Sequence, residues 1–438
     1  MFIRIFFTLI IVILTTSVQA IETLSTLYQL AEQHDPQFKI ADSNRLITLE
    51  SKPQIQATLK PQVTLSGSAS EQFSTKNWIT GDRYESTNLG YNISLNYALY
   101  RQDQHIALQQ ADSRIAQAET EYEAARQALM ERVASRYFDL LASYDGIRFA
   151  QENKKAFAEQ LKQAKERFEV GYIAITDVEE AQAAFDLATS ELILAENQQD
   201  NAIESLREII GTYHKSVATL KADAPLLIPD PTNVDKWTEI ALERNPNIIA
   251  AQQTVEISRQ EIDRQRAAND PVVNLFAEHR YSDSIRGDES SGLATSNSVG
   301  VQVTYSLYEG GAISSRIREA QQRHTQALDA LEQQRRAVQR QTRNAYLNLE
   351  SNISQVKALK QAVTSNETAR NSVKESVAVG MRTAVDLVGA QRDLYQAQRN
   401  YSQARYNYVI NTLRLKQAAG LLNAEDLVAI SDWLNMTK

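Results

Sequence analysis

The chain contains no cysteine, and it is poor in the residues that interrupt regular structure. Its 438 residues include only 14 glycines and 8 prolines. The absence of cysteine excludes disulfides, thiolate metal ligands, a cysteine nucleophile and an acylated N-terminal cysteine. The scarcity of glycine and proline predicts long uninterrupted elements rather than several small domains.

Long apolar runs are also scarce, and the one at the N-terminus has the features of an export signal. Residues 1–20 combine an early cation, Arg4, an apolar run over 5–14 and a final VQA triplet that suits signal peptidase. We predict a cleaved signal peptide; a retained anchor is the alternative, although the run is short for a bilayer span. No later stretch approaches eighteen apolar residues, so a mature chain that crosses a membrane does so as a barrel.

Several function classes find no support in the sequence. The net charge of −8 argues against nucleic acid as a partner, and the basic run EQQRRAVQRQTR from Glu332 follows a helical period, so we interpret it as a solvated helix face. There is no glycine-rich phosphate loop and no nucleophile in a recognised setting. The five histidines are scattered without metal-ligand spacing: His34, His105, His214, His279 and His324. We therefore predict no enzyme activity, no cofactor and no metal site.

The sequence repeats itself at an offset of about half its length. The segment VGYIAITDVEEAQ, from Val170, has a near copy in VGMRTAVDLVGAQ, from Val379. Other landmarks recur at an offset of 209 or 210, among them Pro36 and Pro246, Gly90 and Gly300, Tyr137 and Tyr346, and Gly211 and Gly420. A proline-containing connector over 221–233 separates the copies. We predict a first repeat over 21–224 and a second over 225–438.

Each repeat contains one predicted β-hairpin. Apolar and polar residues alternate in NLGYNISLNYALY, from Asn88, and in SVGVQVTYSLY, from Ser298, as is typical of half-buried strands. Their partners begin at Pro61 and Pro271. The sequence therefore predicts hairpins at about 61–100 and 271–308, four strands in all. Long polar loops are expected over 71–86 and 282–297.

Past each hairpin the apolar period becomes helical. Over residues 111–147 apolar side chains recur in ten steps over 36 residues, a mean spacing of 3.6. We predict a helix from about 102 to 170, roughly 100 Å long at about 1.5 Å per residue, and a second from 312 to about 379. Returning helices are expected to end near Gly211 and Gly420.

The two helical hairpins are predicted to turn at tips over about 171–177 and 380–386. Gly171 and Gly380 stand where a long helix must stop, which is a usual place for a residue that tolerates positive φ. Thr176 followed by Glu179 forms a capping-box pattern for the returning helix, and Thr383 with Asp386 forms a weaker version.

The strand pattern fits two architectures. A soluble sandwich buries one strand face, whereas a membrane barrel turns the apolar face to lipid and the polar face to a watery lumen. Predicted export, small polar residues on one face, and tyrosines at the helix-proximal strand ends favour the barrel; these are Tyr97, Tyr100, Tyr305 and Tyr308. Four strands cannot close a barrel, since about eight are needed. Three copies would supply twelve strands and twelve helices.

With these repeats, the paired tips and ARYNYVINTLRLKQAAG from Ala404, the chain resembles the TolC family of outer-membrane efflux proteins over residues 21–432. The resemblance implies a mainly α fold with a small β part. Long antiparallel helical hairpins would form a trimeric α-barrel, and four strands per chain would enter a shared 12-stranded transmembrane β-barrel. It also implies a homotrimeric exit duct in outer-membrane lipid, with a tunnel projecting into the periplasm. A periplasmic adaptor would join it to an inner-membrane ABC, RND or MFS-type pump for drug efflux or type I secretion.

The resemblance also gives the tips a role as a closed periplasmic entrance. Asp177 matches an acid that pairs with a basic residue of the second tip, here Arg382. Asp386 matches an acid whose three copies ring the channel axis. A second acidic ring would fall at Gly389 and is missing, and an aromatic link expected near Val377 is also absent.

Two alternatives remain open from the sequence. Asp177 and Asp386 could simply favour helix N-termini, where carboxylates are stabilised. The whole chain could be a periplasmic coiled-coil adaptor or chaperone-like module without a pore. An adaptor usually has one helical hairpin inserted in a small β-domain, whereas this chain has two hairpins and a duplicated β element.

Overall fold

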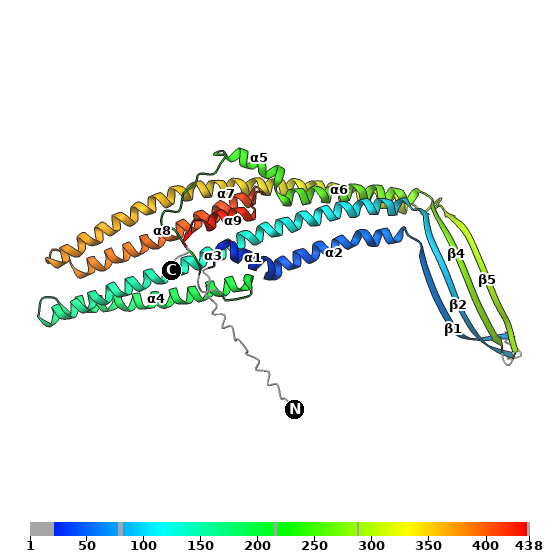
Figure 1. Cartoon of the computed structure of the whole chain (residues 1–438), viewed down its shortest axis with the longest axis horizontal. Helices are drawn as coiled ribbons and strands as arrows, with labels where there is room; N and C mark the ends of the chain where they lie inside the picture. Colours follow the sequence, from blue (N-terminus) through cyan, green and yellow to red (C-terminus); the bar gives the residue numbers. More distant parts are fainter. Residues whose placement is uncertain (1–21, 78–81, 214–216, 287–288, 436–438) are drawn as a thin grey trace, which may run out of the picture.

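The computed structural model describes residues 22–77, 82–213, 217–286 and 289–435, so the predicted signal peptide lies outside it. The first half consists of α1 (Leu24–His34), α2 (Pro36–Thr58), β1 (Gln62–Asn77), β2 (Asp82–Tyr100), α3 (Gln102–Glu169) and α4 (Ile175–Ile210). The second consists of β3 (Thr219–Leu220), α5 (Val234–Arg244), α6 (Pro246–Arg266), a 3-10 turn (Ala267–Asn269), β4 (Val272–Arg286), β5 (Glu289–Thr304), α7 (Ala312–Ala378), α8 (Ala384–Ala418), α9 (Ala424–Ser431) and β6 (Leu434–Asn435). The sheet and the hairpin tips lie at opposite ends of the elongated chain (Figure 1).

The long helices are those that the apolar period predicts. α3 has 68 residues and α7 has 67, so each is about 100 Å long. In α3 the predicted inward stripe contains no exposed residue, and Leu129, Val133, Tyr137 and Leu140 are fully buried. The returning helices end at Ile210 and Ala418. Both helix predictions are confirmed, because a stripe that recurs every 3.6 residues stays on one side of a straight helix.

The four long strands form one antiparallel sheet in the order β1-β2-β4-β5. Its centre joins the two halves of the chain, since β2 pairs with β4 and Tyr91 lies opposite Tyr281. β1 and β5 each have one edge without a partner strand in the described chain.

The prediction of long polar loops is wrong, as is the predicted extent of the last strand. Residues expected in the loops are paired in the ladders, with Glu71 opposite Thr87 and Ser282 opposite Ala294. A ladder is held by backbone hydrogen bonds, and a strand that is wet on both faces has no apolar alternation by which to recognise it. β5 ends at Thr304, so Tyr305 and Tyr308 lie in the connection to α7.

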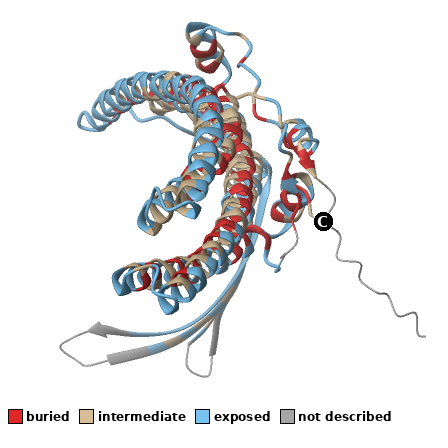
Figure 2. Cartoon of the chain, turned by 90° about the vertical axis from the view of Figure 1, so that its left-hand side faces the viewer, coloured by how far each residue is buried: buried red, intermediate tan, exposed pale blue. Residues whose placement is uncertain are grey.

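The main apolar core lies at mid-length, where α1, α5, α9 and the short β3–β6 sheet pack against the long helices. Tyr137 and Phe138 of α3 are fully buried there, and the Tyr137 hydroxyl donates a hydrogen bond of 2.6 Å to the carbonyl of Ala218. Seen from the tips, the long helices form an open arc, with the short helices on its outer side (Figure 2). The chain is thus a curved layer of long helices with its main apolar core at mid-length.

Candidate functional site at the paired helical tips

Both predicted turns have the geometry of a helix end closed by glycine. Gly171 has φ of 76° and Gly380 has φ of 78°. The N–H of Tyr172 donates to the carbonyl of Arg167 at 2.9 Å, and that of Met381 donates to the carbonyl of Ser376 at 2.9 Å. These six-to-one bonds satisfy carbonyls that the helix end leaves free.

The two returning helices are capped differently. Thr383 is the N-cap of α8: its Oγ1 accepts from the N–H of Asp386 at 3.3 Å, and the Asp386 carboxylate accepts from the N–H of Thr383 at 3.0 Å and from its hydroxyl at 2.9 Å. The backbone and side-chain hydrogen bonds from Thr383 hold the pKa of Asp386 below its ordinary value, with a smaller contribution from the charge of Arg382.

The predicted capping box of Thr176 with Glu179 is wrong. α4 begins at Ile175, two residues earlier than a Thr176 cap implies, so Thr176 lies inside the first turn and Ala174 is the N-cap. Asp177 takes the capping role, since its carboxylate accepts from the N–H of Ala174 at 3.3 Å. The start of the helix leaves the N–H of Ala174 free, and the Asp177 carboxylate is the side chain that reaches it, whatever the pattern of residue types suggests.

One predicted charged gate residue from each tip lines a common cleft. Asp177 from the first tip and Arg382 from the second both line a cavity of about 630 Å³, together with Tyr172, Val377 and Leu387. Within the chain, however, Arg382 forms its ion pair with Asp386, one turn away on its own tip, at 3.9 Å. The structure therefore brings Asp177 and Arg382 to one cleft without pairing them in a single copy.

The tips also expose apolar side chains that were not predicted as functional residues. Tyr172 is 82% exposed and Met381 77%, and Val170 and Val379 are exposed beside them. In the sequence, each turn glycine has an apolar residue on both sides, and this pattern is the feature from which the apolar tips could have been predicted. Clustered exposed apolar residues are typical of interaction sites.

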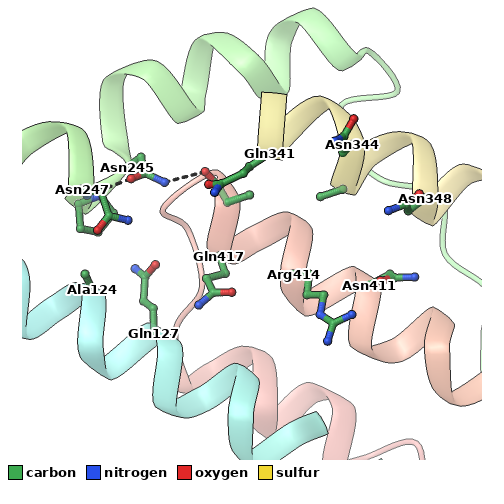
Figure 3. A pocket seen from close by; sticks show the side chains of 13 residues that line it. Ala124, Gln127, Asn245, Asn247, Gln341, Asn344, Asn348, Asn411, Arg414 and Gln417 are labelled. Carbon is green, nitrogen blue, oxygen red and sulfur yellow. Dashed lines mark hydrogen bonds between the residues drawn. The ribbon is translucent and has the colours of Figure 1, made fainter. Parts of the chain in front are cut away.

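A second concavity lies at mid-length, where the C-terminal end of α8 meets the N-terminal end of α6 (Figure 3). Its volume is about 480 Å³, and its walls come from α3, α6, α7 and α8. Amide side chains dominate the lining, among them Gln127, Asn245, Gln341, Asn344 and Gln417. Asn245 joins the two helix ends, since its Nδ2 donates to the carbonyl of Ala418 at 2.9 Å and its Oδ1 accepts from the N–H of Asn247 at 2.9 Å.

The described residues contain no group of three or more histidine, aspartate or glutamate side chains placed to hold a metal ion. None of the described helices is long and apolar enough to span a membrane.

Comparison with known proteins gives consistent matches along almost the whole chain. The outer membrane efflux protein family matches residues 27–212 and again 237–421. The outer membrane protein TolC of Vibrio cholerae serotype O1 is 31% identical over 95% of this chain and 95% of its own length. TolC of Escherichia coli is 29% identical over 96% and 86% of the respective chains.

Solved structures show the same fold at lower identity. The Campylobacter jejuni CmeC outer membrane channel superposes with a TM-score of 0.76 at 17% identity, covering 95% of this chain and 90% of its own. The outer membrane protein VceC of Vibrio cholerae gives a TM-score of 0.73 at 19% identity, covering 91% and 96%.

Two matched helical hairpins, and a sheet whose two edges have no partner strand among the described residues, define one subunit of a tubular channel that further copies complete. The chain belongs to the outer membrane efflux protein family. This is a family of channel proteins rather than enzymes, whose members lie in the outer membrane and act as homotrimers with adaptors and inner-membrane pumps. The predicted fold class and outer-membrane location are confirmed, and the alternative of an adaptor or chaperone-like module is not supported.

Proposed function

We propose that this protein is the passive exit duct of a tripartite efflux pump or a type I secretion system. Its partners would be two further copies, a periplasmic adaptor and an inner-membrane pump of the ABC, RND or MFS type. The observation that carries this proposal is the separation of an apolar-faced sheet from the helical tips by helices of about 100 Å. One relative, AprF of Pseudomonas aeruginosa, is named as an alkaline protease secretion protein. We also propose a mature chain from Ile21 with repeats over 21–224 and 225–438.

The proposed function is tested by crosslinking from the tips in intact cells. A photoreactive amino acid in place of Tyr172 or Met381 stands on the most exposed part of each tip. We expect it to capture one adaptor and, through that adaptor, one pump. Crosslinks confined to copies of this chain at both positions would contradict adaptor docking at the tips.

Outer-membrane lipid is proposed to contact one face of the helix-proximal half of the sheet. Val299 is 78% exposed and Val301 57%, and the register places Leu275 beside Val301 on the same face. Farther from the helices, His279 and Asn297 place a polar pair on this face, with Nδ1 of His279 2.6 Å from Oδ1 of Asn297, while Ile93 of β2 in the same row keeps it apolar.

Replacing Val301 by arginine should impair insertion, because a lipid-facing arginine costs about 2–4 kcal/mol at mid-membrane. Gln302→Arg is the matched control, since the neighbouring residue points to the opposite face. The measurement is the yield of heat-modifiable trimer in outer-membrane fractions. Equal yields for the two variants would mean that this face does not meet hydrocarbon.

The gate is proposed to consist of Asp177, Arg382 and Asp386. Asp177 of one tip and Arg382 of another would hold the entrance closed by charge-assisted hydrogen bonds, while three copies of Asp386 would form a carboxylate ring that favours cations. Gly171 and Gly380 would set the turns, with Thr176 and Thr383 at the starts of the returning helices. At Gly389, an added Cβ would meet nothing within 4 Å, so the missing second ring is not imposed by packing.

Asp386→Asn should relax cation selectivity and weaken block by multivalent cations, because it removes the charge but keeps an oxygen for the cap. Thr383→Ala is the complementary variant, since it weakens the cap and keeps the charge. Reversal potentials in planar bilayers under a salt gradient measure the effect. A shift in Thr383→Ala but not in Asp386→Asn would assign Asp386 to capping alone.

A further inference from the structure

The two lateral margins of the chain are different surfaces. α4 packs on α3 at one margin, and α7 packs on α6 and α8 at the other. The sheet continues this arrangement, with β1 and β5 as its open edges. In Figure 1 α4 and α7 accordingly lie on opposite sides of the tip half. In a closed ring of identical copies, one margin of each copy must meet the other margin of the next.

These margins carry opposite charge. α4 has nine acidic side chains and one basic, a net charge of −8, whereas α7 has eleven basic and six acidic, a net charge of +5. The duplicate counterpart of α4 is α8, which has five basic and two acidic residues. Since α8 builds the same hairpin with a net charge of +3, the acidity of α4 is not a requirement of the hairpin.

The amide-lined pocket shows, inside one chain, how the first repeat packs against the second, with α3 facing α6, α7 and α8. There α3 supplies Gln127 and α8 supplies Gln417, both lining the same cavity (Figure 3). The Nε2 of Gln127 lies 3.5 Å from the carbonyl oxygen of Gly420, just beyond the end of α8. A side chain at this position of the long helix therefore points to the C-terminal end of the returning helix.

The duplication places a second junction of this kind at the free margin. At the offset of 209, Arg336 on α7 corresponds to Gln127 and Glu208 on α4 corresponds to Gln417. In this second junction, α2, α3 and α4 take the places that α6, α7 and α8 have in the amide-lined pocket. The fourth wall of that pocket is α3, whose counterpart in the second junction is α7. That wall must come from a neighbouring copy, so the pocket is incomplete in a single chain.

Four residues of this second junction are charged where their counterparts in the amide-lined pocket are neutral. Asp35, the counterpart of Asn245, is buried and paired with Arg132, the counterpart of Gln341. The Arg336 side chain is 77% exposed and contacts Glu332 on its own helix at 2.8 Å. Glu208 is exposed, and in the described part of the chain no ion pair involves it.

We propose that the seam between neighbouring copies is specified by charge, with Arg336 of one copy docking against Glu208 and the C-terminal end of α4 of the next. A cation there is favoured both by the carboxylate and by the partial negative charge of a helix C-terminus. Two acidic margins or two basic margins would repel each other. The charges therefore favour contact between the α4 margin of one copy and the α7 margin of the next. This inference rests on the trimeric assembly of the proposed function.

The natural absence of cysteine makes the seam directly testable. Arg336→Cys combined with Glu208→Cys is treated with a short bis-maleimide in intact cells, and Gln127→Cys combined with Gln417→Cys is the matched pair inside one chain. We expect the first pair to give covalent dimers and trimers on denaturing gels. The second pair should give an internal crosslink, found by peptide mass spectrometry, and no larger species.

Heat-modifiable trimers measured before crosslinking separate the two possible failures. If trimers are present and the control pair reacts, but the seam pair gives no interchain product, the seam assignment is overturned and the channel function stands. If no trimers form, the proposed function fails with it.

Charge reversal tests whether the contact stabilises the trimer. Arg336→Glu and Glu208→Arg should each lower trimer yield roughly tenfold, because three seams carry the repulsion, and the double reversal should restore it. Arg323→Glu, an exposed arginine elsewhere on α7, is the control for charge alone. Failure of the double reversal to recover trimer beyond either single variant would contradict charge specification.

Discussion

Gly420→Ala is expected to destabilise the protein by about 3 kcal/mol or more. Gly420 follows α8 with φ of +71°, and a Cβ built there would lie 2.4 Å from the carbonyl oxygen of Arg244 and 2.9 Å from Cα of Asn245. These are backbone atoms at the junction of α5 and α6, so they cannot turn away as a flexible side chain would. The measurement is the temperature at which the purified protein unfolds in detergent.

Gly171→Ala is the matched control for this prediction. Gly171 has the same left-handed backbone, with φ of +76°, but a Cβ there would meet nothing within 4 Å. Its substitution carries only the conformational cost, about 1 kcal/mol. If both variants lose the same stability, the close approach of the α5–α6 junction to Gly420 does not contribute.

Asp177→Asn and Arg382→Gln are each expected to raise the resting conductance of the reconstituted channel roughly tenfold. An exposed ion pair contributes about 0–1 kcal/mol, so three copies acting on one entrance contribute up to about 3 kcal/mol, and roughly 1.4 kcal/mol is enough to change an open-to-closed ratio tenfold. Single-channel currents in planar bilayers at low voltage measure this effect.

The choice of asparagine separates gating from capping at Asp177. The asparagine side chain would keep an oxygen for the N–H of Ala174, so a purely capping residue would leave the conductance unchanged. If Asp177 and Arg382 form one pair between copies, the double variant should open the channel no further than either single variant. Additive effects would show that Arg382 acts through its neighbour Asp386 instead.

Several features of the fold and the candidate site were predictable because they are local. The 3.6-residue period located α3 to within one residue at its C-terminal end, and Gly171 and Gly380 marked the positions where the chain turns. The strand segments in the polar stretches were missed, because residues such as Glu71 and Ser282 pair through the backbone alone. The cap of α4 was misplaced because Thr176 and Asp177 are both good N-terminal residues, and only the position of the helix start selects between them.

The amino-acid sequence by itself determined the duplication, the long helices, the two tips and the family, since these follow from periodicity and from residue types at matched positions. Only the tertiary structure decided which residues meet: Arg382 with Asp386 in one chain, Asp177 and Arg382 on one cleft, and α4 and α7 on opposite margins. The physical reason is that hydrophobic periodicity records which side of an element is buried, whereas a contact between distant residues depends on how the elements are packed.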